Sequence, residues 1–187
     1  MSSYPQYAEV NGKRYKINTD YKVALQCNKI SNDDISDEER GLAIIYLLFG
    51  EQGLNDSENW EKLLKIAIKY LSCGKENQGN EEVPNMSYEQ DTGYIKASFF
   101  SDYNIDLSNA QMHWWQFYDL LCGLTEDSIL NRVRFVRDFD VSQIKDGKEK
   151  EKWIKQKQQV ALKQEKREKT SEEKRLDELF EKQLKGE

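Results

Sequence analysis

Apolar and polar positions follow two different periods along this chain. Near the N-terminus, residues 8–10 and 13–17 flank Asn11 and Gly12, a pair that readily adopts the positive φ angles of a two-residue turn. This pattern predicts a small β-hairpin. From residue 18 onward, apolar residues recur every three or four positions, which is the period of an α-helix. We therefore predict a mainly α fold: a compact helical domain with a small N-terminal β-hairpin and a long charged C-terminal helical arm.

Capping residues predict three helices in the first half of the chain. Asp20 can cap a helix that begins at Tyr21, and Ser36 with Glu39 has the spacing of a capping box. A third segment is amphipathic, with apolar residues on one helical face and lysines on another. We expect the first helix to begin at residue 21, the second to span about residues 37–49 before Gly50, and the third to lie between residues 57 and 71.

Two more capping-box spacings predict helices in the second half. Ser87 with Gln90 precedes a helix that should end near residue 104, and Ser108 with Gln111 precedes a helix over residues 112–122. The latter is apolar almost all round, so we expect it to be the core helix. Its polar positions, His113, Gln116 and Asp119, form one narrow strip. Gly123, which follows the helix, should end it in the left-handed conformation.

A further helix should follow residues 125–128, which can cap it. Helical spacing predicts which of its side chains face the core and which face solvent. The residues expected to face inward are Ile129, Leu130, Val133 and Val136. The residues expected to point outward are Arg132, Arg134 and Arg137.

The composition changes after Asp140. Residues 1–144 are expected to form the helical domain, and residues 145–187 a charged, helix-prone arm with only nine apolar residues. Residues 153–162 should pack back on the body, whereas the rest has little to bury and should be poorly ordered alone. Four apolar residues near the end share one helical face, which makes them a candidate partner-binding stripe. They are Leu176, Leu179, Phe180 and Leu184.

Charge and composition limit the setting and the partners. The chain has 187 residues and a net charge of −6, carried by an acidic body, so nucleic acid is not an expected partner. The longest apolar run, residues 41–49, is far shorter than the roughly 20 residues of a membrane-spanning helix, so no membrane is expected either. The first residues lack the pattern of a signal peptide, and the three cysteines form no paired motif. We expect a protein of the reducing cytoplasm.

Candidate chemistry is sparse, and each candidate has a simpler structural interpretation. His113 and Cys122 lie nine residues apart, on roughly opposite faces of a helix, so they should not form a catalytic dyad. The carboxylates of residues 33–39 are better explained as a solvated helix N-terminus than as a metal site. Cys73 is more simply a helix-end cysteine than a reactive thiol. The aromatic residues 114–118 are more often core than a stacking platform. We expect no catalytic, cofactor-binding or metal-binding residue, and no enzyme.

Several segments together resemble the bacteriophage gene-product-fifteen family over roughly residues 8–162. The segments that carry the resemblance are Ile17-Asn-Thr-Asp-Tyr21, Cys73-Gly-Lys-Glu76, Tyr88-Glu-Gln-Asp91, Tyr94-Ile-Lys-Ala97, Tyr103-Asn-Ile-Asp-Leu107 and His113-Trp-Trp-Gln-Phe117. Leu124-Thr-Glu-Asp127, Arg137, Ile144-Lys145 and Trp153 are similar to the closing segment of that family. The resemblance implies a tail assembly protein or chaperone of long-tailed phages, acting in the cytoplasm of the bacterial host. The implied partner is the tail tape-measure protein or the tail-tube protein, and no catalytic residue carries over. The alternative is a structural tail component that is retained in the virion.

Overall fold

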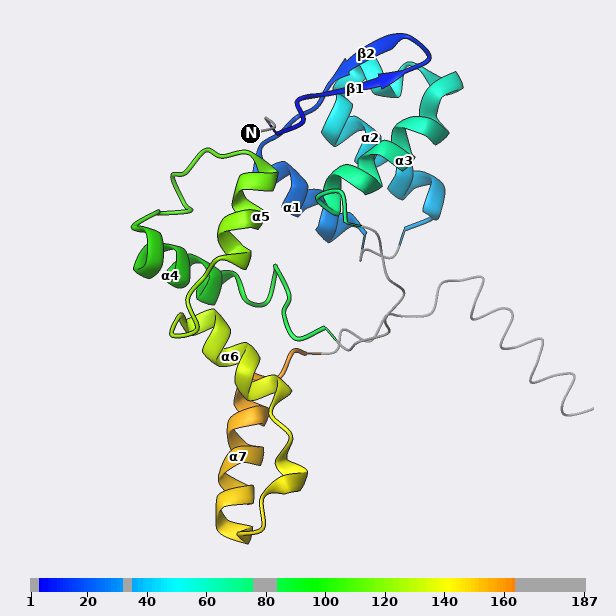
Figure 1. The fold of residues 1–187 in the computed structure, drawn as a ribbon. Helices are drawn as coiled ribbons and strands as arrows, with labels where there is room; N and C mark the ends of the chain where they lie inside the picture. Colours follow the sequence, from blue (N-terminus) through cyan, green and yellow to red (C-terminus); the bar gives the residue numbers. More distant parts are fainter. Residues whose placement is uncertain (1–3, 32–34, 76–83, 164–187) are drawn as a thin grey trace, which may run out of the picture.

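A β-hairpin and seven α-helices make up the described part of the chain, residues 4–31, 35–75 and 84–163 of a computed structural model (Figure 1). The hairpin consists of β1 (Tyr7–Val10) and β2 (Lys13–Lys16). The helices are α1 (Tyr21–Ile30), α2 (Asp37–Leu54), α3 (Trp60–Leu71), α4 (Thr92–Tyr103), α5 (Trp114–Cys122), α6 (Ile129–Asp138) and α7 (Gly147–Val160). Two 3-10 turns, η1 (Ser57–Asn59) and η2 (Val141–Gln143), precede α3 and α7. The predicted mainly helical fold with a small N-terminal hairpin is confirmed.

The β-hairpin forms where the turn residues predict it. Asn11 and Gly12 both have positive φ angles, 51° and 77°, which match the right-handed twist of the two strands. Ala8 pairs with Tyr15, and the side chains of Ala8, Val10 and Tyr15 are all buried. Both strands therefore turn one face toward α2 and α3, against which the hairpin packs.

The capping signals of the first half are confirmed, and the helical conformation of α2 breaks at Gly50, where the second helix is predicted to end. Asp20 caps α1, and Ser36 and Glu39 form a reciprocal capping box at the start of α2. Gly50 adopts φ 64° and ψ −158°, a conformation open almost only to glycine. Beyond this kink a second, short helical segment continues α2 to Leu54.

Helix α5 lies at the centre of the core, as predicted. Phe117 stacks on Tyr21, Phe99 and Trp114, with ring centroids 4.9, 5.1 and 5.7 Å apart. Trp114 is only 1% exposed. Three rings thus converge on one residue of this helix, which joins α1 and α4 through the core.

The predicted end of α5 at Cys122 is confirmed, but its predicted start and the predicted conformation of Gly123 are wrong. The helix begins at Trp114 rather than at residue 112, and His113 is its N-cap, so Ser108 and Gln111 are not its capping box. Gly123 has φ −88°, which is not left-handed. A side chain would nonetheless be crowded there, because its Cβ would lie 3.1 Å from the Tyr103 hydroxyl oxygen and 3.3 Å from the backbone carbonyl oxygen of Asp119.

Helix α4 starts later than its capping signal suggests. The Ser87 hydroxyl does accept a hydrogen bond from the Gln90 backbone N–H, but it closes a turn before the helix, which begins at Thr92. The predicted end is confirmed, because Asn104 adopts the left-handed conformation with φ 55°.

Two predictions for α6 are wrong. Ile129 is 41% exposed, although Leu130 and Val133 are buried as expected. Arg137 does not point outward: its guanidinium donates two hydrogen bonds of 2.7 Å to the carboxylate of Asp91, which is 1% exposed. A buried carboxylate needs a positively charged partner, so the Asp91 carboxylate draws the arginine side chain inward.

Helix α7 returns along the segment that follows α6. Trp153 stacks on Phe139 with ring centroids 4.0 Å apart, and Arg137 donates a hydrogen bond to the carbonyl of Val160. The expected packing of residues 153–162 against the rest of the chain is therefore present. In Figure 1 the β-hairpin with α1–α3 lies at one end of an elongated molecule and α7 at the other. Among the described residues, no helix combines the length and hydrophobicity needed to cross a membrane.

Candidate functional site

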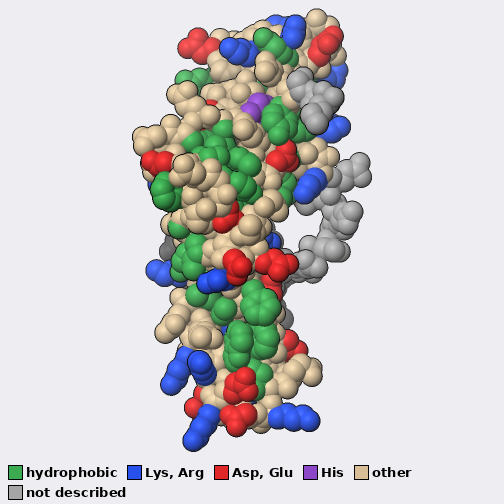
Figure 2. Space-filling model, turned by 60° about the vertical axis from the view of Figure 1, so that its left-hand side comes forward, with side chains coloured by type: hydrophobic (Ala, Val, Ile, Leu, Met, Phe, Trp, Pro, Cys, Tyr) green, Lys and Arg blue, Asp and Glu red, His purple; other side chains and the backbone are tan. Residues whose placement is uncertain are grey.

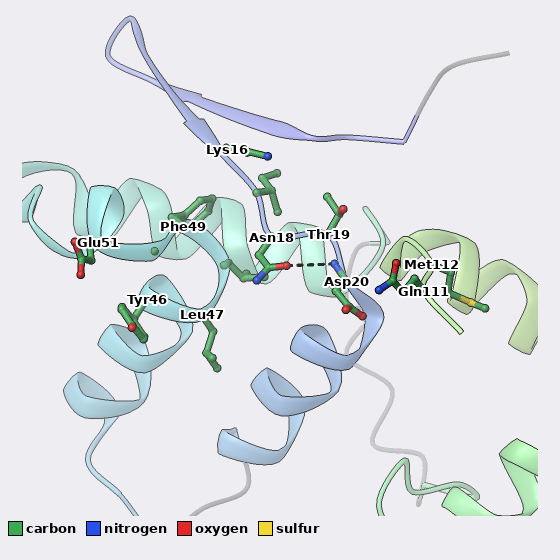
Figure 3. A pocket seen from close by; sticks show the side chains of 13 residues that line it. Lys16, Asn18, Thr19, Asp20, Tyr46, Leu47, Phe49, Glu51, Gln111 and Met112 are labelled. Atoms are coloured by element: carbon green, nitrogen blue, oxygen red, sulfur yellow. Dashed lines mark hydrogen bonds between the residues drawn. The ribbon is translucent and has the colours of Figure 1, made fainter. Parts of the chain in front are cut away.

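An open groove of about 940 Å³ lies between the C-terminal half of α2, the segment joining β2 to α1, and the residues before α5 (Figure 3). The floor of the groove is extended backbone, which hydrogen bonds hold to α2 on one side and to α5 on the other. The backbone N–H of Asn18 donates to the carbonyl of Leu48, while the N–H of Trp114 donates to the carbonyl of Thr19. These bonds hold residues 18–20 like a short strand between α2 and α5.

The groove has a mixed lining. Lys16, Asp20 and Glu51 bring both signs of charge, and Tyr46 and Met112 contribute exposed or half-exposed apolar surface. Asn18 and Asp20 also bond to each other, the backbone N–H of Asp20 donating to the Asn18 side chain (Figure 3). A nucleophile beside a matching base is not present among these lining residues. The groove therefore presents charged, polar and apolar side chains together.

A second surface, at the far end of the molecule, is strongly apolar. Phe135 on α6, Phe139 after it and Trp153 on α7 pack together, and with Ile154, the residue that follows Trp153, they make up what we call the apolar patch. The Phe135 ring lies 6.4 Å from the Trp153 ring, and both contact Phe139. Phe135 is 59% exposed and Ile154 37% exposed. Figure 2 shows hydrophobic side chains gathered on this lower part of the molecule.

The segment that carries the apolar patch is net basic. Residues 129–163 contain ten Lys and Arg against five Asp and Glu, a net charge of +5, although the whole chain is acidic. Lys150 and Lys157 lie four residues before and three after Ile154, hence on the same side of α7. The patch therefore fits an apolar surface with acidic neighbours.

His113 has a role that the sequence did not predict. Its Nδ1 accepts a hydrogen bond from the Trp115 backbone N–H, and its Nε2 lies 3.0 Å from the carbonyl of Pro5. The Tyr4 ring stacks on the imidazole with centroids 5.0 Å apart. Both ring nitrogens are thus engaged in capping α5 and in holding the N-terminal segment against it.

Cys73 lies just after α3, where the sequence predicts a helix-end cysteine. Burial raises the pKa of its thiol to about 12, with a further contribution from Asp119. Burial likewise raises the pKa of Cys27 to about 12. Both thiols therefore stay protonated at neutral pH, which makes them poor nucleophiles.

The structure describes only part of the acidic cluster of residues 33–39. Asp37, Glu38 and Glu39 occupy the first turn of α2, where negative charge is favourable, while Asp33 and Asp34 lie outside the described residues. Within the described ranges no group of three or more His, Cys, Asp and Glu side chains is placed to hold a metal ion.

The aromatic residues of α5 are mainly core, as expected. Trp114 and Phe117 are buried, and the indole N–H groups of Trp114 and Trp115 donate to the carbonyls of Leu71 and Tyr70. They bind α5 to the end of α3 and do not form an open stacking platform.

The predicted C-terminal stripe, Leu176, Leu179, Phe180 and Leu184, lies outside the described residues. The apolar patch, in contrast, was missed by the sequence analysis. The sequence pattern that indicates this patch is the four-residue spacing of Phe135 and Phe139, which places them on one helical face. Trp153 joins these two rings only because α7 returns along α6.

Comparison with known proteins gives one match. A family model described as Bacteriophage Gp15 protein matches residues 2–162. Searches of curated proteins and of solved structures returned no match. The matched range includes both the groove and the apolar patch.

Proposed function

Since this chain belongs to the bacteriophage Gp15 protein family, we propose that it is a non-enzymatic phage tail assembly protein, a chaperone for the tape-measure or the tail-tube protein. It acts in the cytoplasm of the bacterial host while the tail is built. The observation that carries the binding role is the apolar patch on the α6–α7 pair. Exposed aromatic rings beside a basic surface are typical of protein-protein contacts.

The geometry of the patch supports binding of a helix. Phe135 and Ile154 come from two packed helices, so a partner helix can lie across both elements and bury both side chains. A tape measure is a long helical protein that exposes much apolar surface before assembly. Covering such a surface with aromatic residues, while presenting lysines to its acidic positions, would keep it soluble.

Co-expression tests this function. The tape-measure or tail-tube protein encoded with this chain should become more soluble when both are produced together, and should co-purify with it. The double variant Phe135→Glu, Ile154→Glu should lose this effect, because it places charge in the contact. Both side chains are exposed, so the variant should fold.

The matched control is Phe100→Glu. Phe100 is 60% exposed on α4, outside the apolar patch, and this variant should solubilise the partner as well as the wild type does. If neither tail protein gains solubility or co-purifies, the chaperone function is wrong. Detection of the chain in purified virions by mass spectrometry would instead support the alternative, a structural tail component.

A further inference from the structure

The apolar patch has a matching segment within the same chain. The C-terminal stripe, Leu176, Leu179, Phe180 and Leu184, provides apolar side chains at the spacing of one helical face. We propose that this stripe docks on the apolar patch of the same molecule when no tail protein is bound, and that a tail protein must displace it. The docking itself does not depend on the proposed function, whereas the competition does.

Charge complementarity supports this pairing. Residues 176–184 contain three acidic residues and one lysine, a net charge of −2, whereas residues 129–163 carry +5. Asp177, Glu178 and Glu181 alternate with the apolar positions, so they would flank a docked stripe. Acidic side chains beside the stripe and lysines beside the patch favour this contact over an unrelated apolar surface.

The chain between the two surfaces is long enough. The described residues end at Lys163, whose backbone N–H donates to the side chain of Gln90 at 2.8 Å. Twelve residues lie between Lys163 and Leu176, and the thirteen Cα–Cα steps from one to the other can span up to about 45 Å when extended. Trp153 lies seven residues before the end of α7, about 10 Å back along the helix axis. The stripe can therefore reach the patch with chain to spare.

Docking would hide both apolar surfaces at once. Phe135 is 59% exposed, and docking would shield its ring and the apolar side chains of the stripe from water together. The tether raises the local concentration of the stripe near the patch, so a weak contact suffices to cover it. A tail protein then binds only if its helix has a higher affinity for the apolar patch than the tethered stripe has. The stripe would thereby exclude weakly binding partners.

Photo-crosslinking in the full chain tests the docking. A benzophenone-bearing phenylalanine analogue in place of Phe135 is irradiated with no other protein present, and the linked peptides are identified by mass spectrometry. Crosslinks should reach residues 176–184 within the monomer. The substitution Phe180→Glu in the same labelled chain should lower their yield about tenfold, because it places a charge against apolar rings.

The matched control places the analogue at Phe100, which is equally exposed but lies on α4. Crosslinks from this position should not reach residues 176–184. The docking is refuted if no crosslink from position 135 reaches the stripe, if positions 100 and 135 reach it equally, or if linked products appear only at twice the chain mass. Because no tail protein is present, these results are independent of the proposed chaperone function.

Discussion

Single side chains join segments that are distant in the sequence. Asp56, which precedes α3, accepts hydrogen bonds of 2.6 Å from the Lys13 ammonium and the Tyr15 hydroxyl, and one of 3.1 Å from Asn59. These bonds, led by the one from Lys13, lower the pKa of the Asp56 carboxyl to about 2. One carboxylate thus fastens the β-hairpin to the start of α3.

The variant Asp56→Asn should be less stable than the wild type at pH 7. The carboxylate pKa is lower in the folded chain, about 2, than the usual value near 3.9, so its ionisation stabilises the fold above about pH 4. This contribution is lost as the pH falls from about 4 to about 2. Denaturant titrations at pH 7, 4 and 2.5 should therefore show a shrinking difference between variant and wild type. A constant difference would contradict the role of charge.

The ion pair between Arg137 and Asp91 should contribute more to stability than any surface pair. Replacing Arg137 with Met leaves a carboxylate buried without its cation, which costs about 3–5 kcal/mol in the free energy of unfolding. Denaturant titration at neutral pH measures this loss. Arg132→Met is the control, because the Arg132–Asp127 pair is exposed and its removal should cost below about 1 kcal/mol. Equal losses in the two variants would show that burial of the pair is unimportant.

At the scale of elements, local signals failed where distant backbone competed with them. Ser36 with Glu39 and Ser108 with Gln111 have the same spacing, yet only the first pair caps a helix. The backbone of Met112 accepts from the N–H of Tyr21, which keeps it extended beside α1. A helix can therefore begin only after this contact, a condition that no local spacing reveals.

Much of the fold follows from short-range chemistry, whereas the candidate site does not. The β-hairpin depends on the turn residues Asn11 and Gly12, and α1 and α2 begin at their capping residues. The local sequence is therefore enough to predict these features. The inward turn of Arg137 depends on Asp91, 46 positions away, and the apolar patch depends on the return of α7 to Phe139. Such long-range pairings are not encoded in any local period.

The kink in α2 requires glycine for its backbone conformation alone. A Cβ at Gly50 would meet nothing within 4 Å, but φ 64° with ψ −158° is strained for any other residue. Gly50→Ala should cost about 1–3 kcal/mol in the free energy of unfolding. Gly147→Ala is the control, because Gly147 begins α7 with no positive φ and no close neighbour. That variant should be unchanged or up to about 1 kcal/mol more stable. Equal effects in a thermal or denaturant titration would contradict the strain.

At the scale of the whole molecule, burial is uneven from one end to the other. Helix α5 has three buried residues, Trp114, Phe117 and Leu121, whereas α7 has none. The described contacts of α7 are with α6 and η2, and their main anchors are the stack of Trp153 on Phe139 and the bond from Arg137 to Val160. The surface proposed to bind a partner therefore lies on the least buried helix.

Native-state hydrogen exchange should reveal this difference. Backbone amides of α7 should exchange through local opening, at a free energy well below that of global unfolding, because opening α7 exposes few buried apolar groups. Amides of α5 should exchange only with the whole fold. The variant Trp153→Ala should speed exchange in α7 and leave α5 unchanged, since its ring packs on Phe139 and not on the core around Phe117. If α7 exchanges as slowly as α5, it belongs to the cooperative core, and a partner could not remodel it without unfolding the protein.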